Sequence, residues 1–225
     1  MVLRLRYVAG VSPAKWLRVW AERRPDLPIE AARVEEPQQL DELMAGDADV
    51  AFVRLPIEAE GLHQVPLWEE LAVAVLPADH PLADAESITL ADLEGEPLAP
   101  VQPESGMTVE LVAAGTGHAL LPQGVARLHH RRDVVAVPVT DAPATRIALV
   151  WRVERDDDDL QEFVAVVRGR TARSSRGESA GPEASAPPAP ASTARRAQPA
   201  RQEQKSGRGA SARRGRPVRK RGRGR

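Results

Sequence analysis

The sequence predicts an α/β fold, in which parallel strands alternate with covering helices, followed by a basic C-terminal tail. Segments with the two-residue period of strands alternate with segments of helical period between residues 3 and 55. Parallel neighbours need crossover connections, which helices commonly supply. A second alternation extends from residue 71 to residue 168, and the composition changes sharply after Gly169.

The first expected strand covers residues 3–8, where apolar side chains alternate with arginine. A helix should follow, because Ser12 is a favourable N-cap and Pro13 suits the first helical position. One face of this helix would be apolar and would carry Trp16, Leu17, Val19 and Trp20.

The second expected strand covers residues 29–34, and Pro37 is expected to begin a second helix. That helix would bury Leu40, Leu43 and Met44, and Gly46 would end it. Residues 50–53 complete a βαβαβ unit as its third strand. Ligands of such sheets bind outside the carboxyl ends of the strands.

Downstream, residues 71–76 form a near-continuous apolar run, which is typical of a fully buried strand. A short helical turn is expected in "TLADLEGEP". A helix over residues 108–114 should end at the glycines that follow it. Further strands are expected at residues 119–121, 134–139 and 147–151. An amphipathic helix over residues 156–168 places an acidic run at its N-terminus, where the helix dipole favours negative charge.

Charge divides the chain into two parts of opposite sign. Residues 1–168 hold 15 Lys and Arg against 29 Asp and Glu, a net charge of −14, and form the predicted folded domain. The rest of the chain has a net charge of +13. Within it we predict a disordered linker over residues 169–205 and a basic tail over residues 206–225, because the composition offers too little apolar area to offset the ordering entropy.

Cysteine is absent, so the sequence offers neither a disulfide framework nor a thiolate metal site. The N-terminal residues lack the apolar core of a secretory signal, and no stretch is apolar enough for a membrane span. We therefore expect a cytoplasmic protein without membrane contact.

Four motifs resemble the effector-binding (substrate-binding) domain of LysR-type transcriptional regulators. They are "VAGVSPAKWLRVWAERRPDLPIEA", "LDELMAGDADVAFVRLP", "LPADHPLADAESITLADLEGEPL" and "VELVAAGTGHALLP", and they occur in the family's order. The resemblance implies a two-lobed fold similar to periplasmic binding proteins, which binds a small-molecule effector between its lobes and acts in transcription regulation. Two departures are expected. The family's N-terminal winged helix-turn-helix would be missing, unless it is encoded upstream, and the second lobe would be shortened.

The resemblance implies an effector site in the cleft, and we name Ser12, Lys15, Glu36, Gln102 and Thr116 as its candidates. Ser12 heads a predicted helix, so its role as an anion receptor and its role as a plain N-cap are equally compatible with the sequence. Lys15 would add a cation or would be solvated. Glu36, with its neighbour Glu35, would repel an anionic effector unless both point to water. Gln102 and Thr116 fit a structural role at least as well.

The sequence does not indicate an enzyme. Its five histidines show no metal-ligand spacing, and no nucleophile elbow, phosphate loop or dinucleotide fingerprint occurs, so we expect neither a metal nor a cofactor. "RGRP" at residues 214–217 resembles the core of an AT-hook, which lies in the narrow minor groove of DNA. The expected DNA contacts are Arg213, Arg214, Arg216, Arg219, Lys220, Arg221, Arg223 and Arg225.

Alternative roles stay open for this tail. It could contact RNA, improve solubility, or fold back on the acidic domain. The protein would then be an interaction module that does not bind DNA. Expected protein partners are a second copy of the chain or full-length LysR-type relatives.

Overall fold

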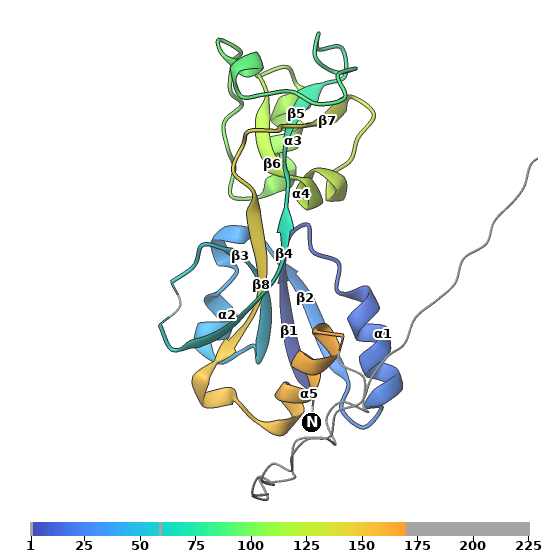
Figure 1. Cartoon of the computed structure of the whole chain (residues 1–225), viewed down its shortest axis with the longest axis vertical. Coiled ribbons are helices and arrows are strands. Elements are labelled where there is room, and N and C mark those ends of the chain that lie inside the picture. Colours follow the sequence, from blue (N-terminus) through green and yellow to red (C-terminus); the bar gives the residue numbers. More distant parts are fainter. Residues whose placement is uncertain (1, 59, 170–225) are drawn as a thin grey trace, which may run out of the picture. The chain divides into compact units, whose positions relative to one another are not determined.

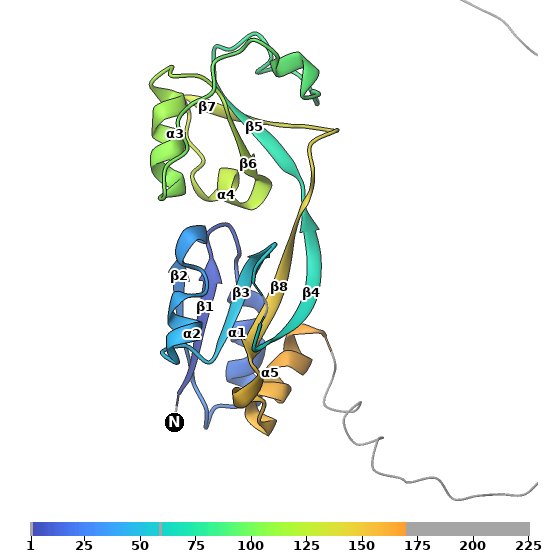
Figure 2. The ribbon, with the colours of Figure 1, turned by 90° about the vertical axis from the view of Figure 1, so that its left-hand side faces the viewer.

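The computed structural model describes residues 2–58 and 60–169, which form two lobes, each built on its own sheet (Figure 1). The first sheet has five strands in the order β2-β1-β3-β8-β4, and the second has three in the order β6-β5-β7. The chain passes between the sheets twice, from β4 into β5 and from β7 into β8 (Figure 2). The two-lobed α/β prediction is confirmed. The predicted tail and nearly all of the linker lie outside the described residues.

The parallel half of the first sheet consists of β1 (Leu3–Val8), β2 (Ile29–Val34) and β3 (Val50–Leu55). β1 lies in the middle and pairs in parallel with both neighbours. The expected βαβαβ unit is therefore present. The loops that follow β1 and β2 leave the same edge of the sheet, because parallel strands bring their carboxyl ends together.

Helix α1 (Ala14–Arg23) covers this sheet together with α5 (Asp158–Val167). Trp20 of α1 donates its indole N–H to the carbonyl of Leu27 at 2.7 Å and packs edge-on against Phe163 of α5. α5 begins two residues later than predicted, but acidic residues occupy its first turn as expected, and the Asp157 side chain accepts from the N–H of Leu160. Of the predicted apolar face of α1, Trp16 and Trp20 are buried, whereas Val19 is exposed.

Two predictions about helix starts are wrong. The N-cap of α1 is Pro13 and not Ser12, and no side chain caps this helix. The helix expected from Pro37 is a 3-10 turn, η1 (Glu36–Gln38), followed by the short α2 (Asp41–Ala45). Leu43 is buried there, but Met44 is exposed, because α2 is too short to present a continuous stripe to the sheet. Gly46 ends α2 in the left-handed conformation, as expected.

An antiparallel pair, β4 (Leu62–Glu70) and β8 (Thr145–Arg152), completes the first sheet. The sequence did not predict β4, because Pro66 interrupts it and its apolar positions do not alternate cleanly. Proline is tolerated on edge strands, where its missing N–H is not needed by a neighbour, and the pairing of β4 with β8 shifts register between Pro66 and Trp68. The η3 turn (Val153–Arg155) then connects β8 to α5.

In the second lobe, β5 (Ala72–Pro77) lies between β6 (Ala119–Pro122) and β7 (Val134–Pro138), antiparallel to both. The short turn predicted in "TLADLEGEP" is the 3-10 turn η2 (Ala91–Leu93). Leu71 lies outside β5 and is 58% exposed, so the strand begins one residue and the buried run two residues later than predicted.

Two helices pack on the second sheet. Helix α3 (Ser105–Ala113) begins three residues earlier than predicted and ends before Gly115. Helix α4 (Gln123–Leu128) follows β6 directly and was not predicted as an element of its own, because six residues give too short a periodic pattern.

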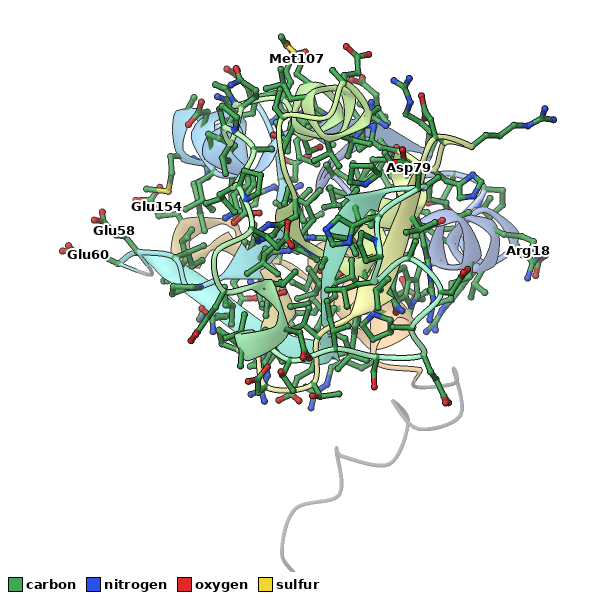
Figure 3. The ribbon with its side chains drawn as sticks, turned by 90° about the horizontal axis from the view of Figure 1, so that it is seen from above. Arg18, Glu58, Glu60, Asp79, Met107 and Glu154 are labelled. Atoms are coloured by element: carbon green, nitrogen blue, oxygen red, sulfur yellow. The ribbon has the colours of Figure 1, made fainter. Side chains whose placement is uncertain are left out.

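Charged side chains, including those of Arg18, Glu58, Glu60 and Glu154, extend outward from the surface (Figure 3). Among the helices of the described part, none is long and apolar enough to span a membrane.

Candidate functional site

The lobes meet where the loop after β1 touches the start of α4. Gly10 has a positive φ of 93°, and a Cβ atom built on it would lie 2.7 Å from the backbone nitrogen of Val125. A Cβ atom on Gly124 would lie 2.7 Å from the carbonyl oxygen of Gly10. Both positions therefore require glycine, since any side chain would force the two backbones apart.

This backbone contact separates two cavities between the lobes. Ala9 and Val125 line one of them, whereas Gly10 and Gly124 line the other. Each cavity has a volume of about 600 Å³, which lies within the range of small-molecule sites.

We name the first the acidic cavity. Its lining joins the loop after β2, the end of β3, the start of β8, and the segments around α3 and β6 of the second lobe. Apolar walls are contributed by Pro37, Val101, Pro103, Leu120, Leu121, Pro122 and Val125, and polar groups by Glu35, Glu36, Gln39, Arg54, Gln102, Ser105, Thr108 and Thr145. An apolar chamber with a few convergent polar groups is typical of small-molecule sites.

Arg54 of β3 is the polar centre of the acidic cavity and is 2% exposed. Its Nε and Nη2 both donate to Glu70 Oε2, at 3.1 and 2.7 Å, and its Nη1 donates to Glu36 Oε2 at 2.9 Å. Nη2 also donates to the carbonyl of Ala9 at 3.1 Å, and the Gln39 amide holds the Arg54 backbone through both N–H and C=O. The guanidinium is thus fixed by carboxylates from two different segments of the first lobe.

A third carboxylate, that of Glu35, connects the lobes directly. Glu35, at the end of β2, accepts at Oε2 from the N–H and the hydroxyl of Ser105, at 3.2 and 2.9 Å. Ser105 opens α3, so this carboxylate occupies the N-terminus of a helix, where N–H groups and the helix dipole favour negative charge. The Ser105 hydroxyl also lies 2.9 Å from Nε2 of His129.

His129 closes this network from the end of α4. Burial lowers the pKa of His129, and nearby Arg33 acts in the same direction, while Glu35 partly opposes them. His129 follows the last residue of α4 and, unlike His130, Arg131 and Arg132, is not exposed. His129 is half-buried because it packs under α3, where its ring approaches Gly106.

One polar atom of the acidic cavity has no partner. The hydroxyl oxygen of Thr145, at the start of β8, is inaccessible to solvent and makes no hydrogen bond within the described residues. Leaving a buried hydroxyl unpaired costs about 1–3 kcal/mol.

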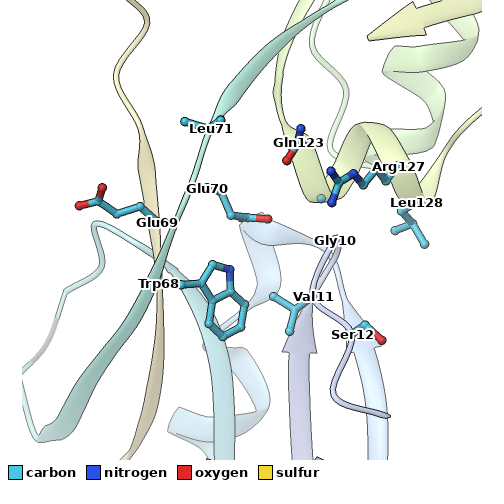
Figure 4. Close-up of a pocket in the computed structure, with 11 residues that line it drawn as sticks. Gly10, Val11, Ser12, Trp68, Glu69, Glu70, Leu71, Gln123, Arg127 and Leu128 are labelled. Atoms are coloured by element: carbon cyan, nitrogen blue, oxygen red, sulfur yellow. The ribbon is translucent and has the colours of Figure 1, made fainter. Parts of the chain in front are cut away.

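The second cavity, which we name the tryptophan cavity, lies on the other side of the glycine contact (Figure 4). Gln123, Arg127 and Leu128 of α4 face the loop of Gly10, Val11 and Ser12. The third side is formed by the end of β4, from Trp68 to Glu70, and by Leu71, which follows it. Trp68 stacks on Trp16 with ring centroids 5.7 Å apart. Arg127 makes no ion pair with any residue of the described ranges.

The five candidate effector contacts are divided by the fold. Glu36 and Gln102 both line the acidic cavity. Ser12 lines the tryptophan cavity. Lys15 lies outside both, with its ammonium 4.2 Å from the centre of the Trp16 ring, and exposed Thr116 donates to the carbonyl of Leu111 at the end of α3. The candidate DNA contacts lie outside the described residues.

Sequence reasoning missed the residues that organise the acidic cavity. Arg54 could have been predicted, because a cation inside the apolar segment "VAFVRL" requires a buried counter-charge. Nothing in the sequence indicated the roles of Glu70 and Thr145, because the pairing of β4 with β8 brings each of them to its place between the lobes. Across the described residues, no group of three or more His, Asp or Glu side chains is arranged to hold a metal ion.

The model of the LysR substrate binding domain matches residues 8–110 and 103–172. The chain belongs to the LysR substrate-binding domain family. Among relatives, the Hca operon transcriptional activator HcaR of Escherichia coli (strain K12) is 29% identical over 187 residues, which cover 70% of this chain and 63% of HcaR. The HTH-type transcriptional regulator CatR of Pseudomonas putida is 34% identical over 147 residues, covering 53% of this chain and 50% of CatR. The chain thus spans between half and two thirds of the length of these relatives.

Solved LysR-type structures share this fold. The BenM effector binding domain with its effector benzoate has a TM-score of 0.63 at 20% identity, covering 79% of this chain and 95% of that one. A Corynebacterium glutamicum OxyR C206 mutant has a TM-score of 0.62 at 23% identity, covering 75% of this chain and 64% of that one. At these identities the likeness establishes the two-lobed architecture of the LysR family.

Proposed function

We propose that this protein is a non-catalytic sensor of transcription regulation, in which the acidic cavity between the lobes holds a small-molecule effector. The acidic cavity is the observation on which this proposal rests. It is lined by both lobes, has apolar walls, and contains a fixed guanidinium and two carboxylates. The description of BenM with benzoate as its effector supports an organic molecule of similar size.

The position of the cavity supports a sensing role over simple storage. Glu35 and Ser105 connect the lobes beside the cavity, and Gly10 meets Gly124 on its other side. A ligand inserted between these contacts interacts with both lobes at once. Its binding therefore favours one relative arrangement of the lobes over others, and a shift between two arrangements is the means by which a ligand is sensed.

A screen for ligand-induced stabilisation tests the proposal. A library of small organic molecules is added to the full chain, and thermal unfolding is followed. Val101→Trp fills the mouth of the acidic cavity at a side chain that is 73% exposed, so it should abolish the response to any true effector without unfolding the protein. Val153→Trp, at another exposed valine that lies in η3, is the control and should keep the response. A ligand that stabilises the Val101→Trp variant equally does not bind in the acidic cavity.

We also propose that residues 206–225 give the protein general affinity for DNA, tethered by residues 169–205. The support is the charge of the sequence, +13 after residue 168. Each phosphate that the tail neutralises should contribute about −0.9 to the slope of log affinity against log salt. Gel-shift assays at low and moderate salt should show that a variant ending at Arg168 loses DNA binding. Equal binding of both forms would instead favour the alternative, a sensor whose tail serves solubility or RNA.

The protein partners we propose are a second copy of the chain or a full-length LysR-type relative. Family membership supports this proposal. Sedimentation of the purified chain, alone and mixed with such a relative, distinguishes the two.

A further inference from the structure

The charges around the acidic cavity restrict the chemical class of its effector, an inference that rests on the function proposed above. Two carboxylates line the polar end of the cavity, those of Glu35 and Glu36, and the buried carboxylate of Glu70, which lies outside this lining, pairs with Arg54. Arg54 provides the one cation among the described residues that line it. Because Glu70 already offsets the charge of Arg54, Glu35 and Glu36 leave the polar end with an excess of two negative charges, in a chamber whose other lining residues are uncharged.

Arg54 is not available to a carboxylate ligand. A guanidinium has five N–H donors, and four of them already point at Glu70, Glu36 and the carbonyl of Ala9. A carboxylate is normally recognised by two parallel N–H groups of one arginine, and here both nitrogens of that fork are engaged by the protein.

The helix N-terminus beside the cavity is occupied as well. The N–H and hydroxyl of Ser105 at the start of α3 are bonded to Glu35, a carboxylate that the protein itself supplies. An anionic effector would have to displace Glu35 and would then leave a carboxylate in the cleft without its donors. Both positions where a negative group could be held are thus filled from within the chain.

The charged groups of the cavity that remain for a ligand are hydrogen-bond acceptors. The hydrogen bonds of Glu35 and Glu36 each use one carboxylate oxygen, Oε2, and the second oxygen of each side chain accepts none within the described residues. These groups require a donor, and the excess negative charge favours one that carries a positive charge.

We propose that the effector is a small organic cation, with a protonated nitrogen directed at Glu35 and Glu36 and an apolar body against Val101, Leu120 and Val125. An amidinium or ammonium group supplies several N–H donors on one atom or one fork. The volume of about 600 Å³ leaves room for an aromatic or branched aliphatic body.

Three probes of equal ring size and different charge test this assignment on the isotope-labelled full chain: benzamidine, benzyl alcohol and benzoate. Binding is followed by the chemical shifts of residues that line the acidic cavity. Benzamidine should bind there at least tenfold more tightly than benzoate. Glu36→Gln should weaken benzamidine about tenfold, and Glu154→Gln, which removes an exposed charge in η3, should leave its affinity unchanged.

The outcomes separate this inference from the function on which it rests. If benzoate or benzyl alcohol binds in the acidic cavity more tightly than benzamidine, the cavity is an effector site and the cationic assignment is wrong. If Glu36→Gln and Glu154→Gln weaken benzamidine equally, the probe responds to overall charge and the assignment is again wrong. If no probe shifts the cavity resonances and no library compound stabilises the chain through Val101, the proposed function itself fails.

Discussion

Replacing Arg54 with methionine is expected to destabilise the folded unit by about 3–5 kcal/mol, because it leaves Glu70 buried without its counter-charge. Arg54 is 2% and Glu70 8% exposed, and the closest ion-pair distance is 2.7 Å. With an effective dielectric constant of about 20, two charges at that distance attract each other by about 6 kcal/mol before desolvation is subtracted. Methionine keeps the side-chain volume, and the bonds from Gln39 to the backbone of residue 54 are retained.

Urea unfolding and thermal unfolding of the full chain measure this cost. For a folded unit of this size, a loss of about 1 kcal/mol lowers Tm by roughly 2–4 °C, so Arg54→Met should lower it by about 10 °C. The double variant Arg54→Met/Glu70→Met should regain most of the loss, since replacing both members of a buried pair by apolar groups is often neutral.

The ion pair between Glu69 and Arg146 offers a matched control, because Glu69 is the neighbour of Glu70 on β4. Glu69 pairs with Arg146, and their side chains are 60% and 50% exposed. Arg146→Met should therefore cost less than about 1 kcal/mol. The reasoning is refuted if Arg54→Met costs no more than Arg146→Met, or if the double variant is as unstable as Arg54→Met alone.

Three further substitutions probe the contact between the lobes and the base of the first lobe. Gly124→Ala should cost about 1–3 kcal/mol in urea unfolding, because its Cβ clashes with the Gly10 carbonyl oxygen and with Glu70; an unchanged stability would show that the lobes do not meet there. His129 has a lowered pKa, so its contribution to stability is complete above about pH 6.5 and is lost as the pH falls through the folded pKa. His129→Gln should reduce the stability difference between pH 7.5 and pH 5. For Asp49, burial would raise the pKa, but hydrogen bonds from two arginines outweigh it and the pKa is lowered. Asp49→Asn should cost about 1–3 kcal/mol at pH 7 and flatten acid unfolding below about pH 4, and an unaltered acid transition would contradict this.

The acidic cavity could be anticipated only in part. Glu36 and Gln102 were named because the resemblance placed their segments on opposite cleft walls, and both line the acidic cavity. Ser12 was named as an N-cap, a role that Pro13 takes, and it lies on the far side of the glycine contact. The local sequence pattern predicts the secondary structure around a residue. Which of the two cavities the residue lines depends on segments that are distant in the sequence.

Periodicity and charge along the chain determined the alternating strands and helices, the acidic domain and its opposition to a basic tail. These properties depend on neighbours within a few residues, where side-chain period and helix caps act. Tertiary structure alone decided that β4 joins the first sheet, that Glu70 meets Arg54, and that Glu35 occupies the start of α3. Each of these contacts joins segments that are not neighbours along the chain, and their energies arise only after those segments have packed together and the intervening water has been removed.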